Sequence, residues 1–324
     1  MAARLAPPYG REDHVGLVSR VGALVFLAAL AAGCGRGGGA EAPATLSAGS
    51  DGGPSASASA DAAMTADPAR GDTPSIYANG CYATREATTA PDPEACATGD
   101  EQGDTVVLYG DSHAAQWYPA VERIASRTGW WLMPVAKMAC PPGGSRVYNV
   151  GLKGQYTQCA SWHDDAMRLI REQDPVLVIV ATRADYYRVM RGDRALTVAE
   201  SEQPLNAALA RDIATFTASG ARVVLIRDTP VPGFDVPECI ESRGAEDCTY
   251  RLAHALPDDA AQIAAAESAG ADVVDLNDNV CGPASPCSTQ IEGLITFRDD
   301  DHLAATFAGT FADALEAAML ALSA

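Results

Sequence analysis

The sequence predicts an α/β protein with a flavodoxin-like three-layer α/β/α fold built on a parallel five-stranded sheet. Short β-rich runs alternate with helical patterns along the chain, which is typical of parallel sheets because each strand returns through a helix. Residues 176–181 (VLVIVA) are continuously apolar, as expected for a strand buried on both faces. Hydrophobic residues make up 48% of the 324 residues and charged residues 20%, which is the composition of a globular protein.

The five expected strands are separated by segments that each have room for a helix. The strands span residues 105–109, 130–136, 176–181, 221–226 and 271–276. The expected helices span residues 114–127, 162–172, 202–218, 257–269 and 303–322. Ligands of such sheets bind at the carboxyl ends of the strands, so the loops that follow the strands are expected to carry the chemistry.

An export signal is expected in residues 1–33. The apolar run at 21–32 follows Arg11 and Arg20 and is shorter than the roughly 20 residues that cross a bilayer, which indicates a secretory signal peptide. The run ends in Leu30-Ala31-Ala32-Gly33-Cys34, which resembles a bacterial lipobox. Cys34 would then be lipidated, and the secreted protein would be anchored to a bacterial membrane in the cell envelope. A plain signal peptide that is cut nearby is the alternative.

Residues 34–74 are expected to form a disordered linker after the lipidated cysteine. They are rich in Gly, Ala, Ser, Pro and Thr and show no hydrophobic period, which is typical of a flexible tether. The folded domain is expected to take residues 75–324. The formal net charge of −19 disfavours nucleic acid as a partner, because an acidic surface repels phosphates.

The cysteines agree with an oxidising compartment. Nine are present, and an even number remains when Cys34 is set aside. A zinc site is the competing interpretation, but no CxxC pair occurs and no His is spaced to complete one. No metal or other cofactor is therefore expected. The simplest pairing joins sequence neighbours: Cys81 with Cys96, Cys140 with Cys159, Cys239 with Cys248, and Cys281 with Cys287.

Ser112 lies between the first expected strand and the first helix, where a hydroxyl would meet a substrate. Backbone N–H groups at a helix start favour a developing oxyanion. A serine nucleophile needs a base, and the base needs an orienting acid. His302 follows the last strand in a loop that returns to the same sheet edge, so the order of elements brings it near Ser112. His113 adjoins the serine but is expected to alternate to the other side of the backbone.

Two sequence blocks carry a resemblance to a known family. Gly110-Asp111-Ser112-His113-Ala114, followed by Gln116-Trp117, resembles the first block of the SGNH (GDSL-like) hydrolases. It is similar in particular to the SGNH domains attached to bacterial membrane O-acyltransferases that modify surface glycans. Asp299-x-x-His302-Leu303 resembles the last block, and Cys140-Pro141-Pro142 and Cys159 add to the likeness. The resemblance covers the chain from about residue 81 to the end, and the two blocks in this order are far more specific than either alone.

The resemblance implies a Ser-His-Asp triad. Ser112 would attack an ester carbonyl, His302 would take its proton, and Asp299 would orient the imidazole. Asp300 or Asp301 remains a possible partner of His302, because three aspartates follow one another. Asp111 is expected to be a structural residue that braces the turn. The Ser112 N–H would contribute to the oxyanion hole.

The chain departs from the wider family at the oxyanion hole. That family uses a Gly and an Asn as further donors, whereas residues 181–185 after the third strand contain no Asn. Members linked to O-acyltransferases also tend to lack this Asn. Gly143 could supply a donor or simply form a turn. Arg183 could contact the substrate or form a salt bridge, and Trp117 could stack on a sugar ring or belong to the core.

The resemblance implies an extracytoplasmic serine esterase or O-acyltransferase that acts on acyl groups, with acetyl expected, of a cell-envelope glycan. Hydrolysis and transfer share the acyl-enzyme, so both remain open. The resembling domains are usually fused to a multi-helix membrane acyltransferase, so a separate membrane acyltransferase is a possible partner. The alternative is a non-catalytic glycan-binding lipoprotein with the same fold. A lipase is a weaker alternative, because no long apolar loop lies near the motifs.

Overall fold

The computed structural model describes residues 66–322. The expected signal peptide, Cys34 and most of the expected linker lie outside the described residues. Among the described residues, no helix combines the length and the apolar character needed to cross a bilayer.

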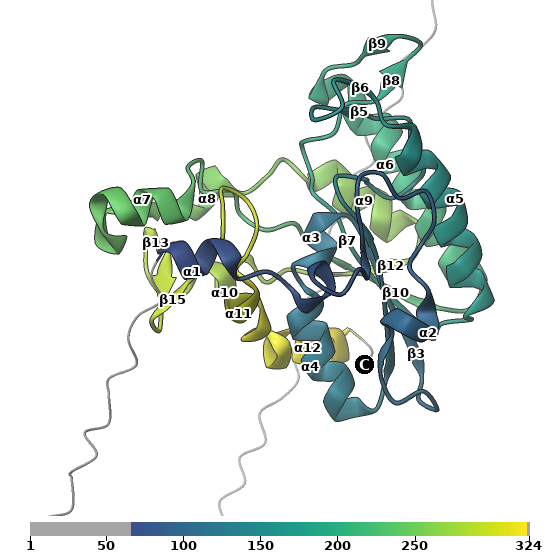
Figure 1. The fold of residues 1–324 in the computed structure, drawn as a ribbon, viewed down its shortest axis with the longest axis horizontal. Coiled ribbons are helices and arrows are strands. Elements are labelled where there is room, and N and C mark those ends of the chain that lie inside the picture. Colours follow the sequence, from purple (N-terminus) through teal and green to yellow (C-terminus); the bar gives the residue numbers. More distant parts are fainter. Residues whose placement is uncertain (1–65, 323–324) are drawn as a thin grey trace, which may run out of the picture. The chain divides into compact units, whose positions relative to one another are not determined.

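A parallel sheet forms the centre of the fold (Figure 1). Its five central strands pair in the order β4-β3-β7-β10-β12, which confirms the flavodoxin-like order predicted from the sequence. These strands are β3 (Thr105–Gly110), β4 (Trp131–Lys137), β7 (Leu177–Ala181), β10 (Arg222–Ile226) and β12 (Ala271–Val274). Each lies within two residues of its predicted position, because a buried strand has a clear apolar pattern.

The sheet is larger than predicted. A short strand β1 (Tyr82–Ala83) pairs in parallel with β4, and β2 (Thr98–Gly99) pairs with β4 in antiparallel orientation. The described sheet therefore has seven strands rather than the expected five. Strands of two residues are too short to show a period, so the sequence pattern could not reveal them.

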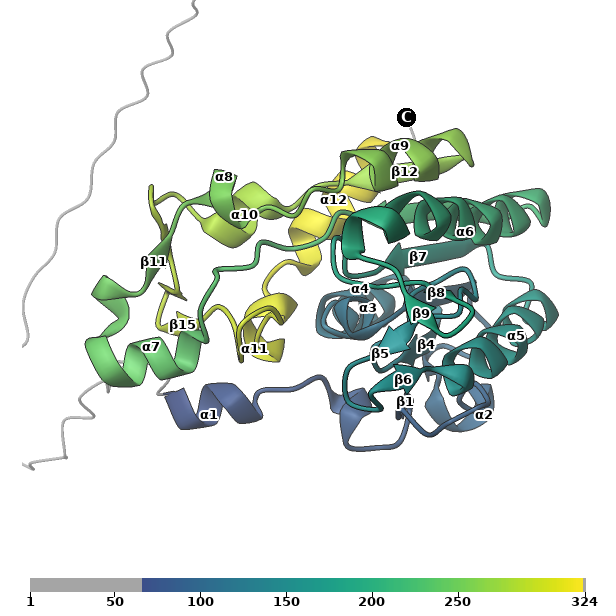
Figure 2. The same ribbon diagram turned by 90° about the horizontal axis from the view of Figure 1, so that it is seen from above.

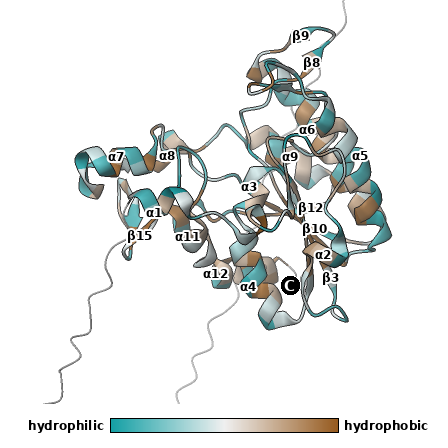
Figure 3. Ribbon diagram, in the orientation of Figure 1, coloured by the Kyte–Doolittle hydropathy of each residue, from teal (hydrophilic) through white to brown (hydrophobic). Residues whose placement is uncertain are grey.

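Helices cover both faces of the sheet. Helices α4, α11 and α12 lie on one face, and α5, α6 and α9 lie on the other (Figure 1). Their bounds are α4 (Tyr118–Thr128), α5 (Thr157–Glu172), α6 (Val198–Ala218), α9 (Ala260–Ser268), α11 (Ala305–Gly309) and α12 (Ala312–Ala321). Along α5, hydrophilic and hydrophobic residues alternate in the manner of a helix with one buried face (Figure 3).

Two expected helices are each divided in the structure. The helix expected at 114–127 becomes α3 (Ser112–Ala115) and α4, and Pro119 lies in the first turn of α4, where its missing N–H costs no hydrogen bond. The helix expected at 303–322 becomes α11 and α12. The sequence pattern missed both breaks because the apolar positions continue across them.

Some of the smaller elements form an extension beside the sheet, and the others lie next to the sheet and its helices (Figure 1). In both views α1, α7, α8 and β15 lie together, away from the central strands (Figure 2). The small helices are α1 (Ala66–Gly71), α2 (Pro93–Cys96), α7 (Val236–Arg243), α8 (Leu252–Ala255) and α10 (Asn277–Cys281). The small strands are β5 (Tyr148–Asn149), β6 (Gly154–Gln155), β8 (Met190–Arg191), β9 (Arg194–Ala195), β11 (Thr249–Tyr250), β13 (Cys287–Ser288), β14 (Gln290–Ile291) and β15 (Leu294–Ile295).

The core has two layers, one on each face of the sheet. Val106 and Leu108 of β3 pack in the layer with α4 and α12. Val107 and Tyr109, which alternate with them, pack in the layer with α5 and α6. Both layers are apolar, so the carboxyl edge of the sheet is where polar side chains gather.

Four disulfides tie down the loops, and each joins the sequence neighbours that the simplest pairing predicted. The bonds are Cys81–Cys96, Cys140–Cys159, Cys239–Cys248 and Cys281–Cys287. Each closes a loop of 6 to 19 residues and typically adds about 2–4 kcal/mol of stability.

Candidate active site

Ser112 is the first residue of α3 and follows directly after β3. Gly110 makes this tight turn possible, because its φ is +151° and a Cβ there would lie 1.9 Å from the backbone oxygen of Ala181. Asp111 caps the helix and accepts a hydrogen bond of 2.8 Å from the N–H of His113. The Ser112 side chain is therefore presented, partly exposed, at the carboxyl edge of the sheet.

Asp111 is fully buried and ties the end of β3 to the loop after β7. One of its carboxylate oxygens accepts hydrogen bonds from the hydroxyl of Thr182 at 2.6 Å, the N–H of Arg183 at 2.9 Å and the hydroxyl of Tyr187 at 2.7 Å. Both of its oxygens thus have partners within the protein. This geometry belongs to a residue that braces the turn rather than one that meets a substrate.

His302 lies in the loop before α11, and its ring is held by Asp299. The Nδ1 atom lies 2.9 Å from one oxygen of Asp299 and 3.1 Å from the other. Asp299 also accepts hydrogen bonds from the backbone N–H groups of Asp301 and His302, at 3.0 and 2.7 Å. One carboxylate thus fixes both the loop and the ring.

Asp301 is a second carboxylate at the same nitrogen. Its Oδ1 atom lies 2.7 Å from Nδ1 of His302. Asp300 and Asp301 are the two other partners that the sequence allows for His302. Asp301 contacts the ring together with Asp299. Asp300 is exposed and lines the cleft beside His302.

The first and last loops of the sheet are fastened to each other by Gln116. Its side-chain oxygen accepts a hydrogen bond of 2.8 Å from the N–H of Leu303, and its amide donates to the hydroxyl of Thr229 at 3.3 Å. Gln116 is fully buried just after α3. The Gln of the first sequence block therefore links the serine helix to the histidine loop.

Ser112 and His302 line one cleft, with a volume of about 460 Å³. The Nε2 atom of His302 is buried and has no hydrogen-bond partner, so the Ser112 hydroxyl is not hydrogen-bonded to it in this structure. Such contacts are often long in a free enzyme and shorten when a substrate binds. The other lining residues are Tyr77, Tyr82, Met138, Ala139, Arg183, Tyr186, Tyr187, Arg298, Asp300 and Asp301.

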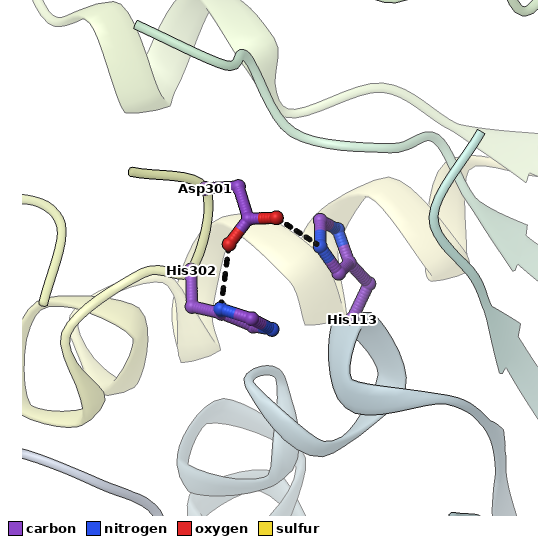
Figure 4. Close-up of side chains that lie close together, drawn as sticks. All are labelled: His113, Asp301 and His302. Atoms are coloured by element: carbon purple, nitrogen blue, oxygen red, sulfur yellow. Dashed lines mark ion pairs between the residues drawn. The ribbon is translucent and has the colours of Figure 1, made fainter. Parts of the chain in front are cut away.

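His113 lies beside the site, contrary to the expectation that it points away. It is 1% exposed, and its ring centre lies 5.0 Å from that of His302. Its Nδ1 atom lies 2.5 Å from Asp228, and its Nε2 atom lies 3.9 Å from Asp301. Figure 4 shows the carboxylate of Asp301 between the two imidazole rings. Alternation holds for strands, whereas His113 is already in a helix, where successive side chains turn by about 100°.

The two histidines have opposite pKa shifts. Burial lowers the pKa of His302, and the nearby His113 adds to this, against the opposing effect of Asp299. Burial also disfavours the charged form of His113, but its contact with Asp228 outweighs burial and raises its pKa. Burial would raise the pKa of Asp299, but its bond to His302 lowers it below its ordinary value. His302 is therefore suited to act as a neutral base beside an ionised Asp299.

Arg183 forms part of the cleft wall. Its guanidinium forms an ion pair with Asp301 and lies 4.2 Å from the ring centre of Tyr186. The salt bridge that the sequence allowed is thus the one to Asp301. Arg183 also lines the cleft.

Two candidate substrate residues lie elsewhere. The N–H of Gly143 donates a hydrogen bond of 2.6 Å to Asp212, and Gly143 does not line the cleft. Trp117 is 1% exposed and packs edge-on against Phe311, so it belongs to the core. Of the alternatives that the sequence left open, these placements favour a turn at Gly143 and a core position at Trp117.

Several residues of the site were not singled out in the sequence. Asp228 follows β10 at the carboxyl edge, and that position alone could have marked it as a candidate. Ala139 lies just after β4, lines the cleft and has a φ of +50°, which is unusual for a residue other than glycine. Tyr77 and Tyr82 precede the first expected strand, where no pattern pointed to a site.

His113, Asp301 and His302 are close enough to share a metal ion. However, Asp301 already pairs with Arg183, and each imidazole faces a carboxylate. A guanidinium at the carboxylate takes the place that a cation would occupy, so we assign no metal to this cluster.

Comparison with known proteins agrees with this architecture. The model of a family described as SGNH domain (fused to AT3 domains) matches residues 80–317. The periplasmic domain of a lipopolysaccharide acetyltransferase from Salmonella serovar Paratyphi A has a similar fold, with 13% identity, a TM-score of 0.53, and coverage of 74% of this chain and 91% of that one. A proposed acylhydrolase from Bacteroides fragilis is also similar, with 13% identity, a TM-score of 0.40, and coverage of 71% and 93%. No curated protein matches the sequence. Because the family model covers well over half of its length, the chain belongs to the family of SGNH domains described as fused to AT3 domains.

Proposed function

We propose that this chain is an extracytoplasmic serine esterase or O-acyltransferase that acts on acyl groups, acetyl in the first place, of a cell-envelope glycan. The observation that carries the proposal is the Nε2 atom of His302, which is buried and unpartnered at a cleft that it shares with Ser112. The opposite nitrogen of the same ring is held by Asp299. A free ring nitrogen beside a serine, with its partner nitrogen oriented by a carboxylate, is the arrangement that activates a hydroxyl.

In the proposed reaction, the Ser112 oxygen attacks an ester carbonyl carbon while its proton passes to Nε2 of His302. The bond from the carbonyl carbon to the leaving oxygen then breaks, and His302 gives that proton to the leaving alcohol. A water or a sugar hydroxyl next loses a proton to His302 and attacks the acyl-enzyme. Ser112 recovers its proton as the acyl group leaves. Asp299 keeps the Nδ1 proton in place throughout, so that Nε2 can accept.

The oxyanion would be bound by backbone N–H groups. Ser112 supplies one, because the first N–H groups of a helix have no acceptor within the helix. Ala139 is the second candidate, in place of Gly143. It follows β4, the neighbour of β3 in the sheet, and lines the cleft in a left-handed conformation that few residues other than glycine adopt. Unusual backbone conformations of this kind gather at active sites.

The location and the glycan are supported by the comparisons and by the sequence. The structurally similar domain is described as periplasmic and as part of a lipopolysaccharide acetyltransferase. The four disulfides fit an oxidising compartment. The lipobox-like sequence at Cys34 supports a lipid anchor. The family description supports a membrane acyltransferase of the AT3 class as the partner that supplies the acyl group.

The test is the labelling of Ser112 and the hydrolysis of p-nitrophenyl acetate. The wild-type chain should react with a fluorophosphonate probe and turn over the ester, and Ser112→Ala should abolish both. Ser126→Ala is the matched control, because Ser126 is exposed on α4 and, within residues 66–322, bonds only to the backbone oxygen of Glu122. Full esterase activity in Ser112→Ala would remove the proposal. Binding of envelope glycans without labelling or turnover would favour the non-catalytic alternative.

A further inference from the structure

Asp301 joins two histidine–aspartate pairs. Its Oδ1 atom lies 2.7 Å from Nδ1 of His302, and its Oδ2 atom faces Nε2 of His113 at 3.9 Å (Figure 4). Asp301 is 4% exposed, and the two rings lie on either side of its carboxylate. The proposed catalytic base and the buried His113 therefore share one carboxylate.

Asp228 fixes the orientation of His113 from the far side. Its Oδ1 atom accepts the N–H of Thr229 at 2.9 Å and lies 2.5 Å from Nδ1 of His113. Its Oδ2 atom accepts the N–H of Ala184 at 2.8 Å. A carboxylate accepts hydrogen bonds, as this one does from both backbone N–H groups, so we assign Nδ1 of His113 as the donor toward Asp228. The other ring nitrogen, Nε2, is buried without a hydrogen-bond partner and is directed at Asp301.

We propose that the His113–Asp228 pair is a positioning unit for the catalytic base: its buried ring, fixed by Asp228 and with Nε2 facing Asp301, keeps Asp301 directed at His302. This inference rests on the proposed role of His302 as the base. His113 does not touch the substrate in this scheme. It acts on His302 through Asp301 and through its own charge.

The charged groups around the two rings decide whether His113 favours or opposes protonation of His302. His113 is faced by the carboxylates of Asp228, Asp111 and Asp301 and by the guanidinium of Arg183. Its acidic neighbours thus outnumber the cation, which favours a charged ring. His302 is faced by Asp299 and Asp301, and by the cations His113 and Arg298. The positive charge on His113 opposes a second positive charge on His302, whose Nε2 then stays free to accept the serine proton.

Removal of this charge should make His302 easier to protonate. In His113→Gln the pKa of His302 should rise, because one of the two nearby cations is gone and Asp301 loses a counter-charge. A base must be unprotonated to act, so the acidic limb of kcat/KM should move to higher pH, by about one unit. Well above that limb, kcat/KM should differ from the wild type by only a few-fold.

The experiment combines NMR titration of the histidine rings with the pH profile of ester hydrolysis in the full chain. In the wild type, His113 should titrate at a higher pH than His302. In His113→Gln, His302 should titrate at a higher pH than it does in the wild type. His254→Gln is the control, because His254 is exposed on α8 and should leave the profile unchanged. An unchanged His302 titration in His113→Gln would overturn the proposal.

A second variant covers the case in which His113→Gln does not fold. Asp228→Asn leaves His113 in place but removes the anion that favours its charge, so His302 should again titrate at higher pH. If His302 titrates above His113 in the wild type, the proposal is wrong whatever the variants do. The proposed function fails separately, through esterase activity that survives Ser112→Ala, so the two failures are distinguishable.

Discussion

Two histidine–aspartate pairs at different sites of the fold have histidine pKa values that are shifted in opposite directions. His302 lies at the cleft with Asp299 on its Nδ1 atom, and its pKa is lowered. His163 of α5 lies on the other face of the sheet, with its Nε2 atom 3.0 Å from both oxygens of Asp212. Burial disfavours its charged form too, but Asp212 outweighs burial and raises the pKa of His163. The same pair of residue types thus accompanies a lowered histidine pKa in one place and a raised one in the other.

Burial lowers the pKa of both rings, and the charged groups around them differ. Cations, His113 and Arg298, stand near His302 and oppose its protonation. His163 has only a second carboxylate, Asp164, in addition to Asp212. Asp212 is also occupied, because it accepts the hydroxyl of Tyr109 at 2.8 Å and the N–H of Gly143. A His–Asp contact alone therefore does not make a base; the ring also needs nearby positive charge and a free nitrogen at a cleft.

The largest expected effect is the difference in esterase activity between variants of His302 and of His163. His302→Gln should lower kcat/KM for p-nitrophenyl acetate by about 10³-fold or more, because the general base is lost. His163→Gln should stay within about threefold of the wild type, because His163 does not line the cleft. Thermal unfolding of both variants checks that each is folded. Equal losses in two folded variants would contradict the assignment of His302 as the base.

The two carboxylates at His302 should differ in importance. Asp299→Asn should lower kcat/KM by roughly 10²–10⁴-fold, because Asp299 holds both the ring and the backbone of its loop. Asp301→Asn should cost about tenfold, because its charge is shared with Arg183 and Asp299 still orients the ring. The measurement is kcat/KM over a pH series, and Asp193→Asn is the control, because Asp193 is exposed and does not line the cleft. A larger loss in Asp301→Asn would make Asp301 the acid of the triad.

The sequence predicted the fold well because buried strands and amphipathic helices have strong periods. The runs at 105–109 and 176–181 became β3 and β7 with nearly the same bounds. The four disulfides followed from neighbouring cysteines. Ser112, Asp299 and His302 were named from two short blocks, and the structure places Ser112 and His302 at one cleft.

The rest of the site depends on contacts between residues far apart in the chain. Asp228 meets His113 across 115 positions, and Gln116 meets Leu303 across 187. No local pattern encodes such a contact. His113 was misplaced because the alternation of a strand was extended one residue into a helix. For Gly143 the sequence allowed either an oxyanion donor or a turn, and only the structure shows that its N–H is directed to Asp212.

The smallest expected effect is a pH-dependent change in the stability that the His163–Asp212 pair contributes. The folded-state pKa of His163 is raised above its unfolded value, so Asp212 stabilises the protein most below the unfolded pKa of about 6.5. That stabilisation is lost as the pH rises through the higher folded-state pKa. The gap in melting temperature between the wild type and His163→Gln should therefore be widest near pH 5–6 and should narrow on the alkaline side. His254→Gln provides the baseline, because it removes an exposed imidazole.

For His302 the dependence of stability on pH has the opposite sign, because its folded-state pKa is lowered. Protonation of this ring in acid should destabilise the fold. His302→Gln should therefore gain stability relative to the wild type as the pH falls below about 6.5. Parallel melting curves for the two variants across this range would show that the two pairs have the same electrostatic surroundings, and the contrast between them would then be lost.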